Sequence, residues 1–174
     1  LILARVIAEF LCHVSQTMTK PATRIQQKNR TAILQAALDV FSQYGFRGAT
    51  VDQIATAAGL SKPNLLYYFP SKAAIHVALL SSLLDLCLDP LRDLDPDGDP
   101  MAEILKYAAG KLDLSRNYPR ESRLFANEVL QGAPRLSDGF PALKTLVDEK
   151  AQVIRTWAES GKIANIDPYH LIFL

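Results

Sequence analysis

Cysteine and histidine are scarce in this sequence. It has two cysteines, Cys12 and Cys87, which are too few for a disulfide framework and do not stand at a metal-ligand spacing. The three histidines, His13, His76 and His170, are scattered along the chain. A lone histidine on a helix is more often a packing or surface residue than a ligand, so we expect no metal site. Few cysteines suit a reducing compartment, and we expect a cytoplasmic protein.

Motifs of catalysis are absent as well. The sequence contains no glycine-rich phosphate loop, no nucleophile elbow, no paired metal-ligand motif and no Ser/His/Asp set that its spacing singles out. Carboxylates such as Glu128, Asp148 and Glu149 fall on amphipathic helical patterns, where a solvated or ion-paired role is the ordinary one. We therefore expect a protein that is not an enzyme and that needs no cofactor.

Residues 1–17, LILARVIAEFLCHVSQT, are apolar but match no targeting or membrane segment. They have no basic start and no A-x-A cleavage site, and the run is too short and too charged to span a membrane. We expect residues 1–17 to be an extension that is not native, with Met18 as the true start, and we expect no membrane association.

Residues 50–72 contain two short helical patterns separated by a glycine. Thr50 and Gln53 have the spacing of a capping box, which starts a helix. Gly59 follows where a residue with positive φ ends a helix, and Ser61 is a second N-cap residue. The apolar faces of the two helices are Val51, Ile54, Ala55 and Ala58, and then Leu65, Leu66 and Phe69. The pattern predicts a helix, a tight turn and a second helix.

The preceding segment supplies a helix for these two to pack on. Its apolar residues recur at helical spacing before Gly45 and Gly48: Ile33, Ala37, Val40, Phe41 and Tyr44. Residues 28–72 therefore make a three-helix unit of the size that a helix-turn-helix domain requires.

Charge is unevenly distributed along the chain. Residues 18–72 hold seven Lys or Arg against two Asp, whereas residues 73–174 hold eleven basic and fifteen acidic residues. A basic segment of this kind suits the neutralisation of nucleic-acid phosphates. An ordinary solvated surface is the alternative explanation.

The rest of the chain is helical in pattern, which makes the predicted fold class all-α. Ser71 can cap a helix that Pro90 ends, and the loop DPLRDLDPDGDP, residues 89–100, follows it. The apolar stripe of that helix is Ala73, Val77, Leu80, Leu84 and Leu88. Further helices are predicted at about residues 100–117, 120–131 and 140–160, and Gly161 closes the last of them. Its stripe is Leu143, Val147, Ala151, Ile154, Trp157 and Ala158.

The string FSQYGFRGATVDQIATAAGLSKPNLLYYFPSK resembles the diagnostic region of the TetR family of one-component transcriptional repressors, FxxxGFxGATVxxIAxxAGLSKxxLYYYFxSK. The resemblance covers residues 28–88. It implies a helix-turn-helix DNA-binding domain with a basic arm, residues 18–72, and a helical ligand-binding and dimerisation domain, residues 73–174. The partners it implies are a double-stranded DNA operator, a small-molecule effector and a second copy of the chain.

By position, the resemblance implies eight DNA-binding residues. Two cap helices aimed at phosphates, three lie nearest the base edges, and three hold the sugar-phosphate backbone. In that order they are Thr50 and Ser61; Lys62, Pro63 and Asn64; and Tyr67, Tyr68 and Lys72. Either tyrosine could instead pack into the small core. Pro63 and Leu66 depart from the family pattern, although a proline is tolerated in the first turn of a helix.

Two further strings, SRNYPRESRLFANEVLQGAPRL and LVDEKAQVIRTWAESGKIANIDPYHLIF, resemble the subgroup that controls pyrimidine utilisation, whose effectors are uracil and thymine. A pocket for a planar, neutral pyrimidine needs an apolar sandwich and fixed polar partners. We expect Phe125 and Trp157 to form the sandwich and Arg123, Asn127 and Glu128 to supply the polar groups. The alternatives are that both aromatic residues are core and that Arg123 and Glu128 form only an ion pair.

The family normally continues beyond IDPYHLIFL through further helices of the dimer interface, so we expect this sequence to be truncated at its C-terminus. The predicted function is a ligand-responsive transcriptional repressor of pyrimidine catabolism genes. Two alternatives remain open. One is a TetR-type regulator of another effector, and the other is an architectural or partner-binding DNA-binding protein without an effector.

Overall fold

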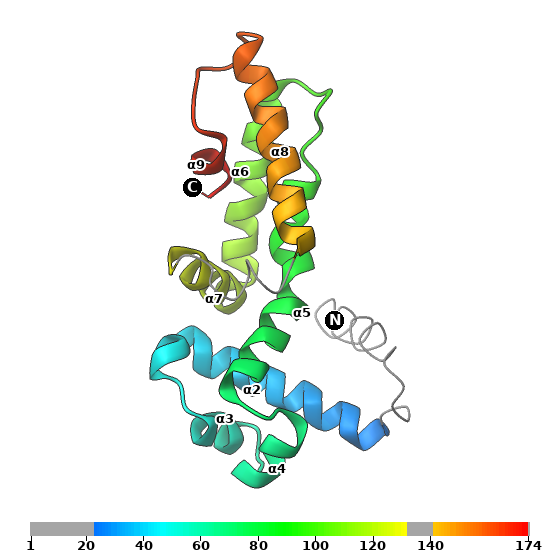
Figure 1. Ribbon diagram of the computed structural model, residues 1–174, viewed down its shortest axis with the longest axis vertical. Coiled ribbons are helices and arrows are strands. Elements are labelled where there is room, and N and C mark those ends of the chain that lie inside the picture. The colour runs from blue at the N-terminus through cyan, green and yellow to red at the C-terminus, as the bar shows by residue number, and fades with distance from the viewer. Residues whose placement is uncertain (1–22, 132–140, 174) are drawn as a thin grey trace. The chain divides into compact units, whose positions relative to one another are not determined.

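The computed structural model describes residues 23–131 and 141–173 (Figure 1). Over these ranges the chain is helical and has no strand, which confirms the predicted fold class. The helices are α2 Arg24–Gly48, α3 Val51–Ala57, α4 Lys62–Tyr68, α5 Lys72–Arg92, α6 Pro100–Asn117, α7 Pro119–Leu130, α8 Pro141–Glu159 and α9 Pro168–Ile172. The chain divides inside α5 into an N-terminal unit, Leu1–Leu83, and a C-terminal unit, Leu84–Leu174. The expectations for residues 1–17 and Met18 lie outside the described residues.

Helix α2 begins earlier than residue 28, where the predicted three-helix unit starts. The side chain of Thr23 accepts a hydrogen bond from the Gln26 backbone N–H at 3.3 Å, and Gln26 Oε1 accepts one from the Thr23 N–H at 2.9 Å. This capping box starts the helix at Arg24. Residues 24–27 therefore belong to α2, although the basic arm is expected to cover residues 19–27.

The predicted apolar face of α2 is largely confirmed. Ile33, Ala37, Val40 and Phe41 are buried in the core of the N-terminal unit. Tyr44, expected on the same face, is 49% exposed. It lies directly before Gly45, whose φ of 65° interrupts the regular helix.

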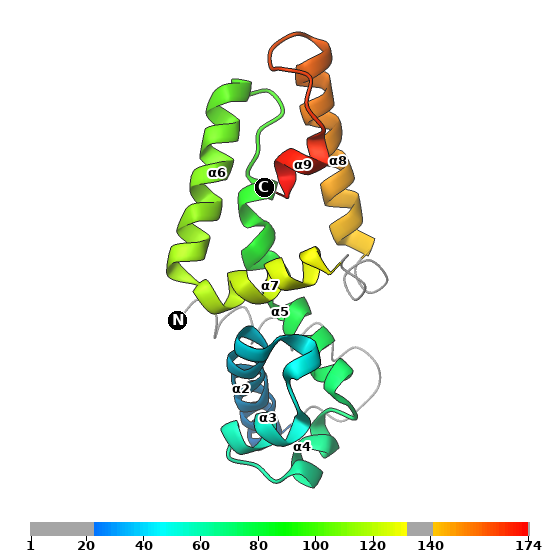
Figure 2. The same cartoon turned by 90° about the vertical axis from the view of Figure 1, so that its left-hand side faces the viewer.

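Helices α3 and α4 have the predicted boundaries and caps; α3 packs on α2, and α4 packs on α3 (Figure 2). Thr50 and Gln53 form a reciprocal capping box, and the Ser61 hydroxyl oxygen accepts from the Asn64 N–H. Gly59 between the helices has a φ of 69°, a conformation that a residue with a Cβ rarely adopts. The local sequence thus fixes a tight turn between two short helices.

Helix α5 does not end at Pro90, so this prediction was wrong. The helix continues to Arg92, whose guanidinium donates to the side chains of Asp85 at 2.8 Å and Asp89 at 3.1 Å. These contacts support the turn in which proline removes a backbone donor. The ring of Pro90 also packs on α6 at Gly110, where a Cβ would lie 3.1 Å from the ring.

The buried face of α5 also differs from the predicted stripe. Leu80 and Leu88 are buried as predicted, but Ala73 and Val77 are exposed. Ile75, Leu79 and Leu83, which the prediction left out, are buried as well. By length and composition α5 is apolar enough to cross a membrane, but half of its most apolar stretch is buried in the fold. Such burial is usual for a core helix of a folded domain.

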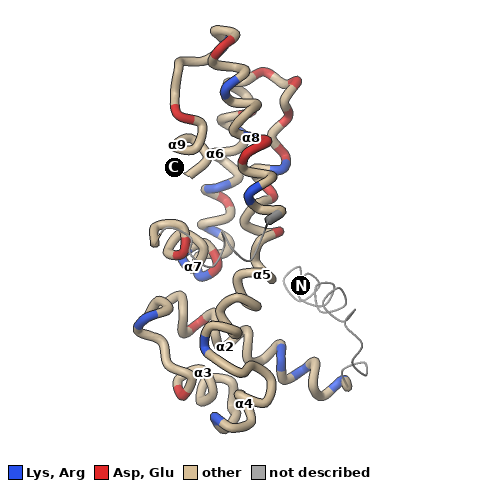
Figure 3. The backbone as a smooth tube through the Cα atoms, in the orientation of Figure 1, with Lys and Arg blue, Asp and Glu red and all other residues tan. Residues whose placement is uncertain are grey.

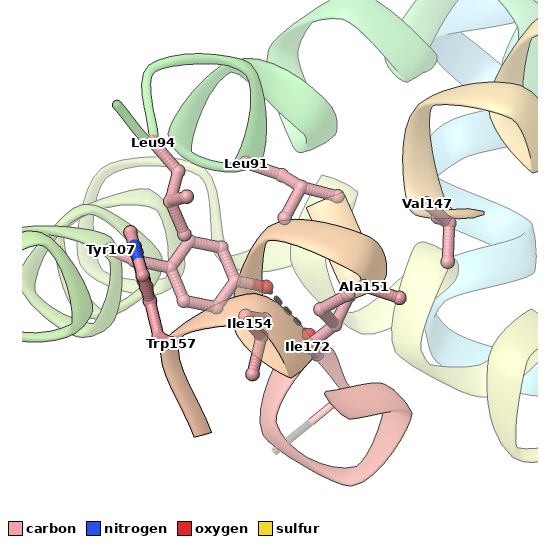
Figure 4. Packing of buried hydrophobic residues seen from close by; sticks show 8 residues of the cluster. All are labelled: Leu91, Leu94, Tyr107, Val147, Ala151, Ile154, Trp157 and Ile172. Atoms are coloured by element: carbon pink, nitrogen blue, oxygen red, sulfur yellow. Dashed lines mark hydrogen bonds between the residues drawn. The ribbon is translucent and has the colours of Figure 1, made fainter. Parts of the chain in front are cut away.

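The C-terminal unit is built around a core of α5, α6, α8 and α9 (Figure 4). Its buried members are Leu91, Leu94, Tyr107, Val147, Ala151, Ile154, Trp157 and Ile172. The hydroxyl of Tyr107 donates to the Ile172 carbonyl at 2.5 Å, which satisfies a polar atom inside this core and ties α6 to α9. The α8 stripe predicted from the sequence supplies four of these buried residues, and Gly161 follows the helix with a φ of 72°.

Candidate nucleic-acid interface and effector cavity

The first turn of α4 presents its side chains to solvent. Lys62, Pro63 and Asn64 are all exposed, whereas Leu65 is completely buried and anchors the helix. The Ser61 cap is made through the Asn64 N–H at 3.4 Å, and Pro63 needs no intrahelical donor at its position. A short helix held by its inner face and exposed along its first turn has the geometry of a recognition helix.

Lys62 pairs with a carboxylate in the free protein. Its ammonium lies 2.8 Å from Asp52 Oδ2 on α3, and both side chains are at least half exposed. An exposed ion pair of this kind contributes less than about 1 kcal/mol. Lys62 can therefore exchange this partner for a phosphate or a base edge at small cost.

The two tyrosines at the end of α4 have different environments. Tyr67 is 73% exposed, whereas Tyr68 is half-buried and accepts a hydrogen bond from Asn29 Nδ2 at 2.8 Å. Their rings meet edge to face with centroids 5.2 Å apart. The residue that enters the core is Phe69, and neither tyrosine is fully buried.

Lys72 has a structural role that the sequence did not predict. Its ammonium donates to the carbonyls of Phe46 and Ala49, both at 2.7 Å, and lies 4.6 Å from the centroid of the Phe46 ring. The residue joins the end of α2 to the start of α5. Because an ammonium has three donors, one remains for a phosphate, and the predicted backbone contact stays a prediction.

Both hydrogen bonds of the Thr50 hydroxyl lie within its own capping box. It accepts from the Gln53 N–H at 3.2 Å and donates to Gln53 Oε1 at 3.0 Å. Its backbone N–H also donates to Gln53 Oε1, at 2.8 Å, so a phosphate contact of Thr50 requires exchange of the Gln53 partner.

Basic side chains dominate the N-terminal unit (Figure 3). Residues 23–83 contain six Lys or Arg and two Asp. Several of the basic positions follow the first half of α2 and the start of α4 in the figure. The sign of this charge suits a duplex, whose phosphates dominate affinity.

The C-terminal unit contains a cavity of about 270 Å³ between α5, α6 and α7. Its lining is mostly apolar, with a few polar groups: Cys87, Lys111, Leu114, Ser115, Ser122, Phe125, Ala126, Val129, Leu130 and Phe173. Phe125 is therefore the one predicted effector residue on this wall. The remaining predicted ones do not line it.

The predicted aromatic sandwich is not formed. Trp157 lies in the core of the C-terminal unit, 2% exposed, and its Nε1–H donates to the Pro96 carbonyl at 3.3 Å. Arg123 points to solvent, Asn127 is half-buried and Glu128 is buried away from the cavity lining. Helical spacing placed Phe125 and Trp157 correctly on inner faces, but these faces belong to different parts of the unit.

The polar groups of the cavity are ones that the sequence did not single out. Ser122 Oγ is buried and has no hydrogen-bond partner in the described part of the chain. Lys111 is half-buried, and burial lowers its pKa. Burial also raises the pKa of the Cys87 thiol to about 12. A cavity lined by an unsatisfied hydroxyl and a partly desolvated ammonium favours a ligand with acceptor atoms.

Comparison with known proteins agrees with these features. Residues 33–79 match the family model of bacterial regulatory proteins of the tetR family, and residues 80–174 match the C-terminal region of YcdC-like proteins. The chain is 51% identical over 157 residues to the HTH-type transcriptional regulator RutR of Escherichia coli K12, which covers 90% of this chain and 74% of that relative. It is 32% identical over 148 residues to the HTH-type transcriptional repressor NicS of Pseudomonas putida, and the match covers 82% of this chain and 68% of NicS.

Solved structures share the fold. AibR, solved in complex with isovaleryl coenzyme A and operator DNA, superimposes with a TM-score of 0.67 at 19% identity, covering 83% of this chain and 82% of AibR. A TetR-like regulator from Rhodococcus sp. RHA1 superimposes with a TM-score of 0.62 at 23% identity, covering 77% of this chain and 73% of the regulator. With the helix-turn-helix geometry and the two family models, these findings confirm the predicted resemblance. The chain belongs to the TetR family of transcriptional regulators.

Proposed function

We propose that the protein is a cytoplasmic, homodimeric repressor without enzymatic activity, and that a small molecule controls its contact with operator DNA. The observation that carries the DNA side is the exposed first turn of α4, fixed from beneath by the buried Leu65 and at its start by the Ser61 cap. Asn64 and Lys62 take the base edges, with Pro63 shaping the contact between them.

Backbone contacts surround this turn. Tyr67 and Tyr68 donate their hydroxyl protons to phosphates, and Lys72 adds its remaining donor. The first turns of α3 and α4, which Thr50 and Ser61 cap, face phosphates with the backbone N–H groups that the caps leave unused. Phosphate contacts fix the position of α4 on the duplex, and the base contacts then supply sequence preference.

For the effector we propose a pyrimidine such as uracil or thymine, bound in the cavity of the C-terminal unit. The resemblance of residues 115–173 to the pyrimidine-utilisation subgroup supports this class. Phe125 offers an aromatic wall, and Lys111 and Ser122 offer donors to the two ring carbonyls. The cavity of about 270 Å³ lies near the small end of ligand pockets, which suits a single ring.

A pyrimidine can act as a switch only by binding one conformation of the dimer more tightly than the other. We propose that the effector favours the conformation with weaker operator contact, so that binding relieves repression. Helix α5 supplies Cys87 to the cavity wall, and the same helix contains the boundary between the two units.

A thermal shift titration tests the effector. Uracil or thymine at a hundred times its Kd would stabilise the folded protein by about 2.7 kcal/mol, and unrelated metabolites would not. Ser122→Ala and Lys111→Met should lose this stabilisation, and Arg123→Ala, which lies off the cavity, should keep it. No shift with any pyrimidine would contradict the subgroup, and a shift with another metabolite would identify a different effector.

A further inference from the structure

One face of α2 contacts the last turn of α4. Gln26, Asn29 and Arg30 stand at i, i+3 and i+4, so their side chains share that face. Asn29 Nδ2 donates to Tyr68 Oη at 2.8 Å, and Arg30 donates to the Tyr68 carbonyl at 3.2 Å. Gln26 Nε2 lies 3.5 Å from Tyr67 Oη. Side chains of α2 thus contact both tyrosines, which lie about forty residues away in sequence.

Arg30 holds the backbone of the same turn. Its guanidinium lies 4.3 Å from the centroid of the Phe69 ring, and Phe69 is buried in the core. The carbonyl of Tyr68 is one of the last of α4, and such carbonyls have no intrahelical partner. Arg30 therefore fixes where the Tyr68 main chain lies, and Asn29 fixes where its hydroxyl lies.

The direction of the Asn29 bond decides what the Tyr68 hydroxyl can do. A tyrosine hydroxyl has one proton to donate and lone pairs that accept. A phosphate can only accept, so Tyr68 must keep its proton for that contact. Because the Asn29 amide donates, it occupies a lone pair of Tyr68 Oη and leaves the proton free.

We propose that Asn29 is a positioning residue for DNA binding: its amide directs the hydroxyl proton of Tyr68 toward a backbone phosphate. The inference rests on the proposed phosphate contact of Tyr68. An acceptor at position 29 would have the opposite effect, because it would take the tyrosine proton for itself.

Fluorescence anisotropy with a mixed-sequence duplex at low salt tests this, because a phosphate contact does not depend on operator sequence. The variants are Asn29→Ala, Asn29→Asp and Tyr68→Phe, together with both double variants. Gln27→Ala is the matched control, since it lies on the same helix and no bond joins its side chain to α4 in the described part of the chain. Circular dichroism melting checks that each variant is folded.

Tyr68→Phe should weaken binding about tenfold, as expected when one hydrogen bond to a charged group is lost. Asn29→Ala should weaken it by a smaller factor and Asn29→Asp by a larger one. With Phe at position 68, Asn29→Ala should have no further effect, and the loss from Asn29→Asp should shrink to that of its added charge.

The outcomes separate the inference from the proposed function. If Tyr68→Phe weakens binding but the Asn29 substitutions have the same effect in both backgrounds, then Asn29 does not act through Tyr68 and the inference fails. If Tyr68→Phe leaves binding unchanged, then the phosphate contact itself is refuted, and the inference fails with it. Asn29→Asp has the size of asparagine, so it keeps the test valid should the alanine variant unfold.

Discussion

Replacing Lys72 by methionine is expected to destabilise the N-terminal unit. The Lys72 ammonium donates to two carbonyls at 2.7 Å, those of Phe46 and Ala49, at the point where α2 ends. Carbonyls at the end of a helix have no intrahelical donor, so these contacts satisfy them. Methionine retains the length of the side chain and its packing on Phe46 but removes both hydrogen bonds.

The magnitude follows from the number and kind of bonds. A hydrogen bond to a charged group contributes about 1.5–3 kcal/mol, and two that share one half-buried ammonium are not additive. We therefore expect Lys72→Met to lower the free energy of unfolding by about 2–3 kcal/mol. Lys62→Met is the control, because it removes only an exposed ion pair and should cost less than about 1 kcal/mol.

Urea unfolding followed by two signals can locate the loss. The single tryptophan, Trp157, lies in the core of the C-terminal unit, so its fluorescence reports on that unit. Far-UV circular dichroism reports on the helices of both units. Lys72→Met should lower the midpoint of the dichroism transition and leave the tryptophan transition in place. If Lys72→Met and Lys62→Met have equal stability, the structural role of Lys72 is wrong.

Three further outcomes are expected. Asn64→Ala should reduce the preference for a selected operator over random duplex by about tenfold in competition binding, and an equal loss on both duplexes would contradict base readout. Trp157→Phe should lower the free energy of unfolding by about 1–3 kcal/mol in urea titrations and leave pyrimidine affinity unchanged. Phe125→Leu should lower that affinity. If Trp157→Phe lowers pyrimidine affinity and Phe125→Leu does not, Trp157 and not Phe125 contacts the effector. In a Cys12→Ser background, iodoacetamide should alkylate Cys87 in the folded protein only slowly up to pH 10, because the thiolate reacts and the folded-state pKa is about 12, above its ordinary 9.0. Because the folded-state pKa is raised, the contribution of Cys87 to stability is complete below pH 9 and is lost as the pH rises toward 12. Fast alkylation at pH 9 would show that the thiol is not buried.

Features set by neighbouring residues could be predicted from the sequence. The capping box at Thr50, the Ser61 cap and the turn at Gly59 depend on contacts within three or four residues, and all three occur as predicted. The same holds for the α8 stripe that includes Val147 and Ile154. The capping box of Thr23 and Gln26 is also a local feature, and the spacing of these two residues is enough to predict the start of α2.

Features that depend on distant partners could not be predicted in this way. Lys72 contacts carbonyls more than twenty residues away, and Pro90 is accommodated by a glycine on α6. Trp157 and Phe125 each lie on an inner helical face, but the sequence does not say which core each face meets. The sequence also does not indicate Lys111 and Ser122 as cavity residues, because only the packing of α6 and α7 brings them to one cavity.

A titration of duplex DNA with the protein at low ionic strength tests whether the exposed first turn of α4 enters the major groove. We expect a complex whose log K falls linearly with log salt, with a smaller slope for Lys72→Met, which removes a proposed phosphate contact. We also expect that methylating guanine N7 in a selected duplex, which blocks major-groove contacts, weakens that complex. Absence of any complex, or one that major-groove methylation leaves unchanged, would contradict this placement of α4.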